Sequence, residues 1–471
     1  MDPEAFADHL LHPRGRDHAP GDAHHGAAGG ALCGDLVKLS IAVRGDRVAD
    51  AGFAASGCGA VTAAGSAAVE LLRGAHVLDA ARISPATLAD ELGGLSPGKL
   101  HAADLVSDAL HAALGAAVRA GAGLAPREDR TLVAMSGGVD SAVAALLVAR
   151  SGREAVGVTL ELWRDPENDA EASCCSASAV RAARAVAHGM GLPHLTIDLR
   201  EEFRAGVVEP WLADHAAGLT PNPCVRCNGH VRLDAMLELA TAVGAADLAT
   251  GHYARMTPDG LLRSAADPAK DQTYMLAALD PASIARLRFP LGELAKPAVR
   301  ALAAEAGLPV ASKADSQDLC FLAGTGRAAF LARHAGLRER PGAFVDARGA
   351  VLGRHDGHHG FTVGQRKGIG LGGGEPLYVL ATDADANTVT VGRREELRTD
   401  RVRVRDARLH RPGGEVDRVK LRYRSRAVPC RVAGDGPDLE LELLEPVDGA
   451  APGQSACLLR GDAIVGWATI A

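Results

Sequence analysis

The stretch that decides the fold is Met135-Ser136-Gly137-Gly138-Val139-Asp140-Ser141. It follows the apolar run Thr131 to Ala134 and precedes Ala142 to Arg150, a run of small and apolar residues. This order predicts a strand, a glycine turn and a helix. Glycines let the backbone approach an anion, the N–H groups of the turn point inward, and the helix adds the positive end of its dipole. A phosphate-binding turn for a nucleotide is therefore predicted, with an ordinary strand-to-helix connection as the alternative.

The residues at the end of the turn separate two kinds of phosphate chemistry. A Walker loop ends in Gly-Lys-Ser or Gly-Lys-Thr, and no such triplet follows here, which disfavours hydrolysis of a terminal phosphate. Ser136 to Ser141 instead resembles the PP-loop of ATP pyrophosphatases. That resemblance implies cleavage of ATP between the α and β phosphates, with AMP left on a substrate oxygen and pyrophosphate released.

The composition is typical of a soluble protein with several domains. A chain of 471 residues, 47% hydrophobic and 23% charged, exceeds one core and suggests about three domains. No apolar run could span a bilayer and the start shows no signal pattern, so a cytoplasmic location is expected. Nine cysteines in such a chain favour thiols, metal ligands or sulfur carriers over disulfides. A net charge of -7 argues against a generally basic nucleic-acid binder but leaves room for a local basic patch.

Hydrophobic periodicity divides the chain. Residues 1–30 look flexible apart from a short helix near Phe6; a hairpin over 36–53 and helices over 61–73 and 100–120 follow. Residues 121–130 are a predicted linker, after which strands alternate with helices, as in a parallel sheet covered on both faces. Beyond about Phe344, short alternating stretches predict a β-barrel. The predicted fold class is multidomain α/β, with an α+β front part.

One cysteine pair lies in Thr220-Pro221-Asn222-Pro223-Cys224-Val225-Arg226-Cys227-Asn228. We expect a proline-set loop before a helix whose N-cap is Asn228. Cys227 would then lie at the positive helix end with Arg226 beside it, which lowers the pKa of the thiol and suits a nucleophile or a soft-metal ligand. A lone Cys-x-x-Cys leaves zinc binding and a purely structural role open.

Further blocks make a closer resemblance visible. They are Thr220 to Asn228, Ala249 to Tyr253, Lys270 to Tyr274, Asp315 to Phe321 and Gly364 to Gly368. Together with Ser136 to Ser141 they resemble, in order, the defining blocks of tRNA-specific 2-thiouridylase, the MnmA family, from about residue 128 to the end. The resemblance implies a PP-loop domain over 131–290, a small central domain over 291–345 carrying Cys320, and a C-terminal β-barrel over 346–471. It also implies that ATP-dependent chemistry replaces the 2-oxygen of the wobble uridine of certain tRNAs by sulfur.

The same resemblance assigns the site residues. The nucleotide site with ATP and Mg²⁺ takes Met135, Ser136, Gly137, Gly138, Asp140, Ser141 and Gly251. Cys320 would bear a persulfide and Cys227 would be its partner. AMP turns the C2 oxygen into a good leaving group, and two cysteines allow one to deliver sulfur while the other resolves the product as a disulfide. Asp315 is expected to position the activated base, with helix capping as the alternative.

Cys224 departs from the family pattern, which in many members has Asp at this position. Cys224, Cys227 and Cys320 could together hold a 4Fe–4S cluster with one iron open to hydrosulfide, as the alternative to the persulfide route.

The front part has a resemblance of its own. Cys33-Gly34-Asp35, Ser56-Gly57-Cys58-Gly59 and Lys99-Leu100-His101 resemble the ligand loops of the NifU/IscU iron–sulfur scaffold, over about residues 1–120. By that analogy Cys33, Asp35, Cys58 and His101 would ligate zinc or iron. Ala102 stands where the scaffold has its third cysteine, so a domain kept for docking is the alternative. Tethering would favour local delivery of sulfur from a donor such as a cysteine desulfurase or a sulfur carrier.

Basic residues in the last part indicate where tRNA would bind. Arg401 and Arg403 alternate with valines, and Lys420, Arg422 and Arg424 alternate with Leu421 and Tyr423, so period two would place each set on one strand face. Gln365, Arg366 and Lys367 of the Gly364 to Gly368 block join this predicted RNA-binding set. We therefore predict an ATP-dependent tRNA-uridine 2-sulfurtransferase with a scaffold-like front domain. The alternatives are another PP-loop adenylating synthetase and a non-enzymatic iron–sulfur or metal carrier.

Overall fold

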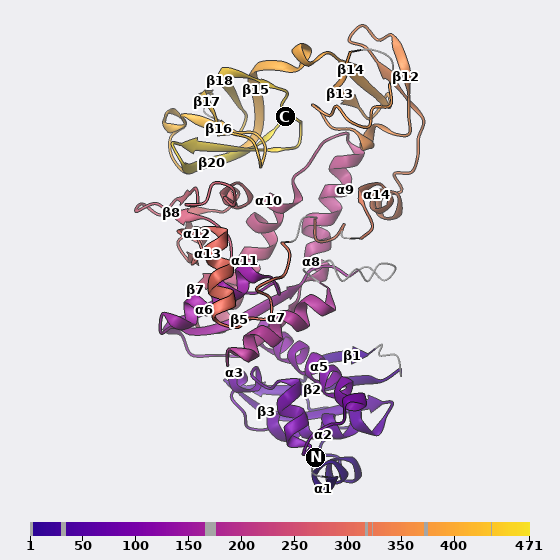
Figure 1. Cartoon of the computed structure of the whole chain (residues 1–471), viewed down its shortest axis with the longest axis vertical. Coiled ribbons are helices and arrows are strands. Elements are labelled where there is room, and N and C mark those ends of the chain that lie inside the picture. Colours follow the sequence, from indigo (N-terminus) through magenta and orange to yellow (C-terminus); the bar gives the residue numbers. More distant parts are fainter. Residues whose placement is uncertain are drawn as a thin grey trace. The chain divides into compact units, whose positions relative to one another are not determined.

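The computed structural model, drawn in Figure 1, describes residues 3–29, 34–164, 176–315, 319–322, 324–371, 375–434 and 436–471. Its internal contacts divide the chain into two units. The first contains Met1–Arg200, Ala235–His252 and Arg286–Cys320, and the second contains Glu201–Asp234, Tyr253–Ala285 and Phe321–Ala471. Within the described residues, no helix combines the length and apolar character that crossing a membrane requires.

The first unit begins with an antiparallel sheet in the order β1-β2-β3. Its strands are β1 (His24–Gly29), β2 (Leu36–Arg44) and β3 (Arg47–Ser56), and its helices are α1 (Pro3–Leu11), α2 (Gly59–Leu72), α3 (Val77–Ala80), α4 (Pro85–Glu91) and α5 (Leu100–Arg119). The predicted hairpin and both long helices are confirmed. The expectation of a flexible start is wrong for His24–Gly29, because small residues let this strand lie against α5. A Cβ on Gly26 would come within 1.9 Å of the Ala109 carbonyl oxygen.

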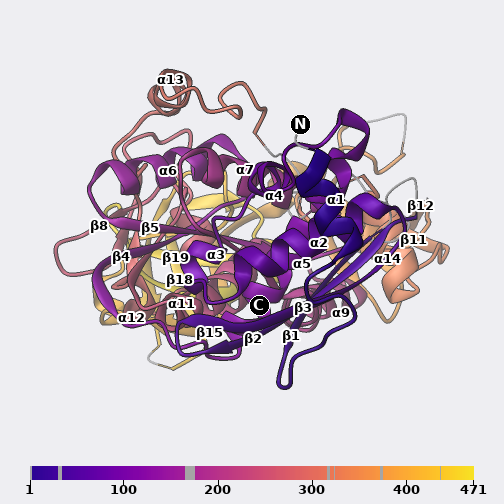
Figure 2. The same ribbon diagram turned by 90° about the horizontal axis from the view of Figure 1, so that it is seen from below.

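The parallel sheet of the first unit has the order β10-β7-β4-β5-β6. Its strands are β4 (Arg127–Ala134), β5 (Glu154–Glu161), β6 (His194–Asp198), β7 (Ala245–Ala249) and β10 (Leu287–Arg288), accompanied by α6 (Val139–Arg150), α7 (Ala177–Gly189) and α13 (Lys296–Glu305). The predicted parallel α/β order is confirmed, and Figure 2 shows α6 and α7 on the same face of the sheet. β4 starts at Arg127, so the predicted linker contributes its last residues to the central strand.

In the second unit the strands of residues 398–470 form a closed barrel of six. Neighbouring strands follow the order β15 (Arg398–Leu409), β18 (Leu439–Asp448), β17 (Val428–Ala433), β16 (Arg418–Lys420), β19 (Ser455–Arg460) and β20 (Ala463–Ile470), and β20 pairs with β15. Val404, Val419 and Leu441 are among the residues that fill it. β9 (Leu262–Arg263) and β8 (Arg255–Met256) extend the barrel sheet at β20. The predicted C-terminal barrel is confirmed for residues 398–470, whereas the predicted start at residue 346 is too early.

A separate four-stranded sheet precedes the barrel. Its order is β12 (Val351–His355), β11 (Gly342–Val345), β14 (Thr388–Gly392) and β13 (Tyr378–Asp383), and Phe344, Val379 and Val389 lie in its own core. The strands beyond residue 345 therefore form two sheets, a division that alternation alone does not encode because it leaves strand partners unspecified. The helices of this unit include α9 (Glu209–Ala216), α10 (Pro223–Cys227), α12 (Pro281–Ile284) and α14 (Arg327–Ala335), while α8 (Arg200–Phe203) and α11 (Leu233–Ala242) lie where the chain passes between units.

Candidate functional site

The glycine turn between β4 and α6 is closed by its own serines. Ser136 N donates to Ser141 Oγ at 3.1 Å, and Ser141 Oγ donates to the Gly138 carbonyl oxygen at 3.1 Å. Gly138 is the N-cap of α6 and gives the helix no side-chain cap, so the first N–H groups of α6 face the turn. The predicted strand, turn and helix are present at the central strand of the sheet.

Two glycines bring other segments against this turn. Gly137 has a φ of +67°, and a Cβ there would meet the Ala179 carbonyl oxygen of α7 at 2.7 Å. A Cβ on Gly251 would lie 2.8 Å from Ser141 N, so the segment after β7 packs directly on the start of α6. Met135 is buried and its N–H donates to Val158 O at 2.7 Å. These contacts place Gly251 and Met135 beside the turn, as the motif order implied.

A lysine joins the turn to a distant carboxylate. Lys296 Nζ lies 2.7 Å and 2.8 Å from the two carboxylate oxygens of Asp140, and 2.9 Å from Asp315 Oδ1. Arg300 also meets Asp315 at 2.9 Å, and Lys313 Nζ donates to Gly137 O at 2.9 Å. The structure therefore links Asp315 to the glycine turn through three cations that the sequence did not identify. One signal was available: Lys296 opens α13, where a cation opposes the helix dipole and so needs another reason to be there.

In the second unit Asn222 caps the short helix that carries Cys224 and Cys227. Asn222 Oδ1 accepts from Cys224 N at 3.1 Å and from Val225 N at 3.4 Å, and Pro223 takes the first helical position. The expected N-cap at Asn228 is therefore wrong, because the Asn-Pro pair is the stronger start signal. Cys224, half-buried, lies in the first turn, while Cys227, 9% exposed, lies at the end of α10, so the expected position of Cys227 at the positive end of a helix is wrong. Three residues apart on a helix, the two side chains share a face.

Other motif residues hold this helix within the second unit. Gln272 Oε1 accepts from Tyr253 N at 3.0 Å, and Tyr274 is fully buried with its hydroxyl donating to Ser455 O at 2.7 Å. Burial raises the pKa of the Tyr274 phenol, which stays protonated. Asn228 Nδ2 donates to Met275 O at 3.2 Å. The Lys270 to Tyr274 block thus connects the cysteine helix with the barrel.

Cys320 is the last residue of the first unit. It is half-buried, and Ser316, Gln317 and Asp318 before it lie outside the described residues. Phe321, the first residue of the last segment of the second unit, has its ring centroid 5.2 Å from that of Trp211. Cys320 and the Cys224–Cys227 pair belong to different units, so their convergence stays a prediction.

Three of the four expected metal ligands of the front domain converge. Asp35, Cys58 and His101 offer ligand atoms that all lie within 4.8 Å of one another. Asp35 Oδ2 is 3.2 Å from Cys58 Sγ and 3.0 Å from His101 Nε2, and Asp35 is 1% exposed. Zinc bonds of about 2.0–2.3 Å in a tetrahedron separate ligand atoms by about 3.5 Å, so this donor set fits zinc or iron. Cys33 lies outside the described residues, as do Cys174 and Cys175.

The remaining barrel thiols are packing residues. Cys430 and Cys457 are 3% and 1% exposed. Burial raises the pKa of Cys430 to about 11 and that of Cys457 to about 12, so both are protonated and unreactive at neutral pH.

The basic residues of the barrel are less uniform than their spacing suggested. Arg401 and Arg403 are exposed on β15, but Arg401 meets Glu440 at 2.7 Å and Arg403 lies 3.9 Å from the same residue. β16 ends at Lys420, which lies 3.7 Å from Asp271. The expected strand face through Arg422 and Arg424 is therefore wrong: these residues lie in a turn.

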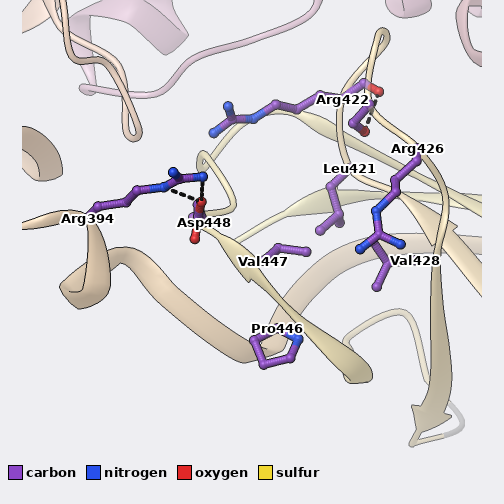
Figure 3. Close-up of a pocket in the computed structure, with 10 residues that line it drawn as sticks. Arg394, Leu421, Arg422, Arg426, Val428, Pro446, Val447 and Asp448 are labelled. Atoms are coloured by element: carbon purple, nitrogen blue, oxygen red, sulfur yellow. Dashed lines mark hydrogen bonds and ion pairs between the residues drawn. The ribbon is translucent and has the colours of Figure 1, made fainter.

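Ser425 explains why the alternation stops. Its N–H and its hydroxyl both donate to Arg422 O, at 3.1 Å and 2.9 Å, and the resulting turn replaces the strand. A cavity of about 380 Å³ opens here, with Leu421, Val428 and Val447 on its apolar side and Arg422 and Arg426 among its cations (Figure 3).

The rim of this cavity carries carboxylates as well as guanidinium groups. Arg394 meets Asp448 at 2.6 Å, as Figure 3 shows, and Arg426 meets Glu445 at 2.6 Å. Arg422 donates to Val363 O at 3.2 Å, next to the Gly364 to Gly368 block. In that block Gln365 bonds its own loop, through Thr362 N and Lys367 O, while Arg366 and Lys367 are exposed. Gln365 thus shapes the loop that presents the two cations.

Comparisons with known proteins match four successive parts of the chain. Family models match the NifU-like N terminal domain over residues 3–119, the tRNA methyl transferase HUP domain over 129–324, the tRNA methyl transferase PRC-barrel domain over 328–393 and the aminomethyltransferase beta-barrel domain over 396–470. The bifunctional protein NifU/MnmA of Rubrobacter xylanophilus is 43% identical over 98% of this chain and 97% of its own. The tRNA-specific 2-thiouridylases MnmA of Methylorubrum extorquens and Methylobacterium radiotolerans are 43% and 45% identical, each over 72% of this chain and 91% of their own.

Fold and site together define a PP-loop nucleotide-binding protein with a cysteine-bearing helix, a C-terminal barrel and a scaffold-like front domain. Within that class, the chain belongs to the NifU/MnmA family.

Proposed function

We propose that the protein thiolates the wobble uridine of tRNA at C2, using ATP as the adenylating agent. The observation that carries this proposal is the link from Asp140 through Lys296 to Asp315. Asp315 begins the block that contains Cys320, and five residues of chain extend at most about 18 Å. The block that would deliver sulfur therefore begins beside the glycine turn. Membership of a family whose curated relatives are named 2-thiouridylases supports the same activity.

The proposed reaction has two steps. The uridine O2 attacks the α-phosphorus of ATP, the bond to the β-phosphate oxygen breaks, and pyrophosphate leaves with that electron pair. The terminal sulfur of a Cys320 persulfide then attacks C2 and AMP departs with the former carbonyl oxygen. The Cys227 thiolate attacks Cys320 Sγ, which forms a disulfide and leaves sulfur on C2; a thiol reductant resets the pair.

The residues around the turn suit the first step. N–H groups of the turn and of α6 would bind the phosphates, Lys296 and Lys313 would stabilise the developing negative charge, and Asp140 would hold Mg²⁺. A 4Fe–4S cluster on Cys224, Cys227 and Cys320 would supply open-site iron for hydrosulfide in place of the persulfide. Cys224 and Cys227, on one helical face, fit either route.

The front domain is proposed to hold zinc or iron at Asp35, Cys58 and His101, and to bring sulfur from a cysteine desulfurase or a sulfur carrier close to the enzyme. The donor set of thiolate, carboxylate and imidazole is the observation that supports this role.

The test is to mix the protein with ATP, unmodified tRNA and a sulfur donor, and to measure pyrophosphate and 2-thiouridine. We expect both products from the wild type, and pyrophosphate without thiouridine from Cys320→Ala. An amide-forming synthetase would keep its full turnover after Cys320→Ala, and a metal carrier would release no pyrophosphate. Iron and acid-labile sulfide that disappear in Cys224→Ala would select the cluster route.

A further inference from the structure

Helix α5 of the front domain lies along β6, the edge strand of the parallel sheet, within the first unit. The approach is at backbone distance, because a Cβ on Gly115 would lie 1.9 Å from Thr196 O. His111, fully buried on the same helix, meets His194 O through Nδ1 at 2.9 Å, and Arg119 donates to Asp198 O at 2.7 Å. The front domain is thus packed on the sheet edge and is more than a tethered module.

Helix α7 connects this contact to the nucleotide turn. On one side, Asp108 of α5 accepts from Arg181 Nε at 2.7 Å and also pairs with Arg184, which is 4% exposed. On the other side, the Ala179 carbonyl oxygen lies 2.7 Å from the position that a Cβ on Gly137 would take. Ala179, Arg181 and Arg184 fall within two turns of one helix. A shift of the two arginines would therefore also shift Ala179, which packs against Gly137 of the glycine turn.

The burial of Arg184 makes its carboxylate partner important. A guanidinium out of water is costly unless a carboxylate compensates its charge, and Asp108 lies in the front domain. Loss of that carboxylate would leave the buried guanidinium without this compensating charge, which favours a shift of Arg184 and of α7 toward water.

We propose that Asp108 is a positioning residue for the nucleotide turn: acting through Arg181, Arg184 and α7, the front domain sets the affinity of the PP-loop domain for ATP. This inference rests on the proposed role of the turn as the ATP site. Asp108 contacts neither ATP nor tRNA in this scheme, so its influence is on KM for ATP.

The experiment uses the full chain with Asp108→Asn, the rescue variant Asp108→Glu, and Asp104→Asn as the matched control. Asp104 is exposed on α5 one turn away, so the control removes the same charge without touching α7. Pyrophosphate release is measured against ATP concentration with tRNA saturating, and folding is checked by circular dichroism and thermal unfolding. We expect Asp108→Asn to raise KM for ATP about tenfold with kcat within about twofold, less than the roughly 10²-fold that a misplacement of about 1 Å can cost. Asp104→Asn should match the wild type, and Asp108→Glu should recover most of the loss.

A folded Asp108→Asn protein with the KM of Asp104→Asn overturns the proposal. Should Asp108→Asn fail to fold, Arg181→Gln replaces it, because Arg181 is exposed and its loss leaves Arg184 paired. KM for ATP should then rise about threefold, and an unchanged KM overturns the proposal equally. A wild-type protein that releases no pyrophosphate refutes the proposed function. In that case the ATP affinities of the wild type and of Asp108→Asn, measured by calorimetry, decide the inference separately.

Discussion

Lys296 is the residue on which the charge balance of the nucleotide site depends. It is 8% exposed and lies between Asp140 and Asp315. Lys296→Met would remove the cation shared by Asp140 and Asp315 and leave Arg300 on Asp315, so more negative charge would face the phosphate oxygens. We expect kcat/KM for pyrophosphate release to fall about 10²-fold or more, the range seen when one stabilising group is removed.

The matched control for this change is Lys38→Met, since Lys38 is an exposed lysine of β2 in the same unit. It should retain the wild-type kcat/KM. Equal kcat/KM values for Lys296→Met and Lys38→Met would show that Lys296 does not contribute to pyrophosphate release.

Asp35 is the residue that organises the metal ligands of the front domain. It is nearly inaccessible, it accepts from Cys58 N at 2.8 Å, and its second oxygen meets both other ligands. Asp35→Asn keeps the shape but removes the charge that a cation needs. Zinc affinity, measured by competition with a chromophoric chelator, should fall at least about tenfold, the scale on which even outer-shell partners act.

Cys430→Ala serves as the thiol control for that measurement, since Cys430 is buried in the barrel. It should bind zinc like the wild type. If neither Asp35→Asn nor Cys58→Ala lowers the zinc affinity, then Asp35, Cys58 and His101 pair only with one another and do not ligate zinc.

Among the elements, the contact of α5 with α7 and β6 is expected to lose stability at low pH. His111, His188 and His194 have lowered pKa values, chiefly because burial disfavours the charged imidazole and further because Arg184 lies nearby; that of His188 falls to about 4. They are neutral in the folded protein, while in the unfolded chain they take up protons near pH 6.5. These histidines therefore leave the free energy of unfolding unchanged above about pH 6.5. Below that pH the free energy of unfolding falls by about 1.4 kcal/mol per pH unit for each histidine.

Thermal unfolding at pH 7.5, 6.5 and 5.5 checks this expectation. His188→Gln should lose less stability between pH 6.5 and 5.5 than the wild type. His12→Gln should behave like the wild type, because the side chain of His12 is 77% exposed. A parallel loss in all three proteins would contradict the assignment of the pH dependence to this contact.

Local signals in the sequence predicted most elements correctly. The strands around Ser136–Ser141 and the barrel strands follow from periodicity, because each is recognisable without its partners. One helix start and one strand end were predicted wrongly, each for an identifiable reason. Asn222-Pro223 begins α10 earlier than Asn228. Ser425 turns the chain where alternation suggested a continued strand. β1 was missed because Ala and Gly carry little strand propensity, and this strand forms by pairing with β2 and packing on α5.

At the scale of the whole molecule, motifs were predictable and their partners were not. Asp140 and Asp315 were identified from sequence, but Lys296 between them was not, since its role comes from tertiary contacts alone. Asp108 is a similar case: an ordinary helix residue in sequence, it meets two arginines more than seventy positions away. Pairings of this kind depend on how domains pack, which periodicity does not encode.

The distribution of charge over the second unit predicts where tRNA would bind this acidic protein. Arg401 and Arg403 have glutamate neighbours on β18, whereas Arg424 lies exposed in the turn beside the cavity of Arg422 and Arg426.

A phosphate contact releases condensed counterions, so each lost contact lowers both the affinity and its salt dependence. Arg424→Glu should weaken tRNA binding about tenfold at low salt and reduce the salt slope by about 1, while ATP binding stays unchanged. Arg403→Glu, the matched reversal beside Glu440, should have the smaller effect because that surface is already partly neutralised. Filter binding over a salt series measures both, and equal slopes for Arg424→Glu and the wild type would place the RNA elsewhere.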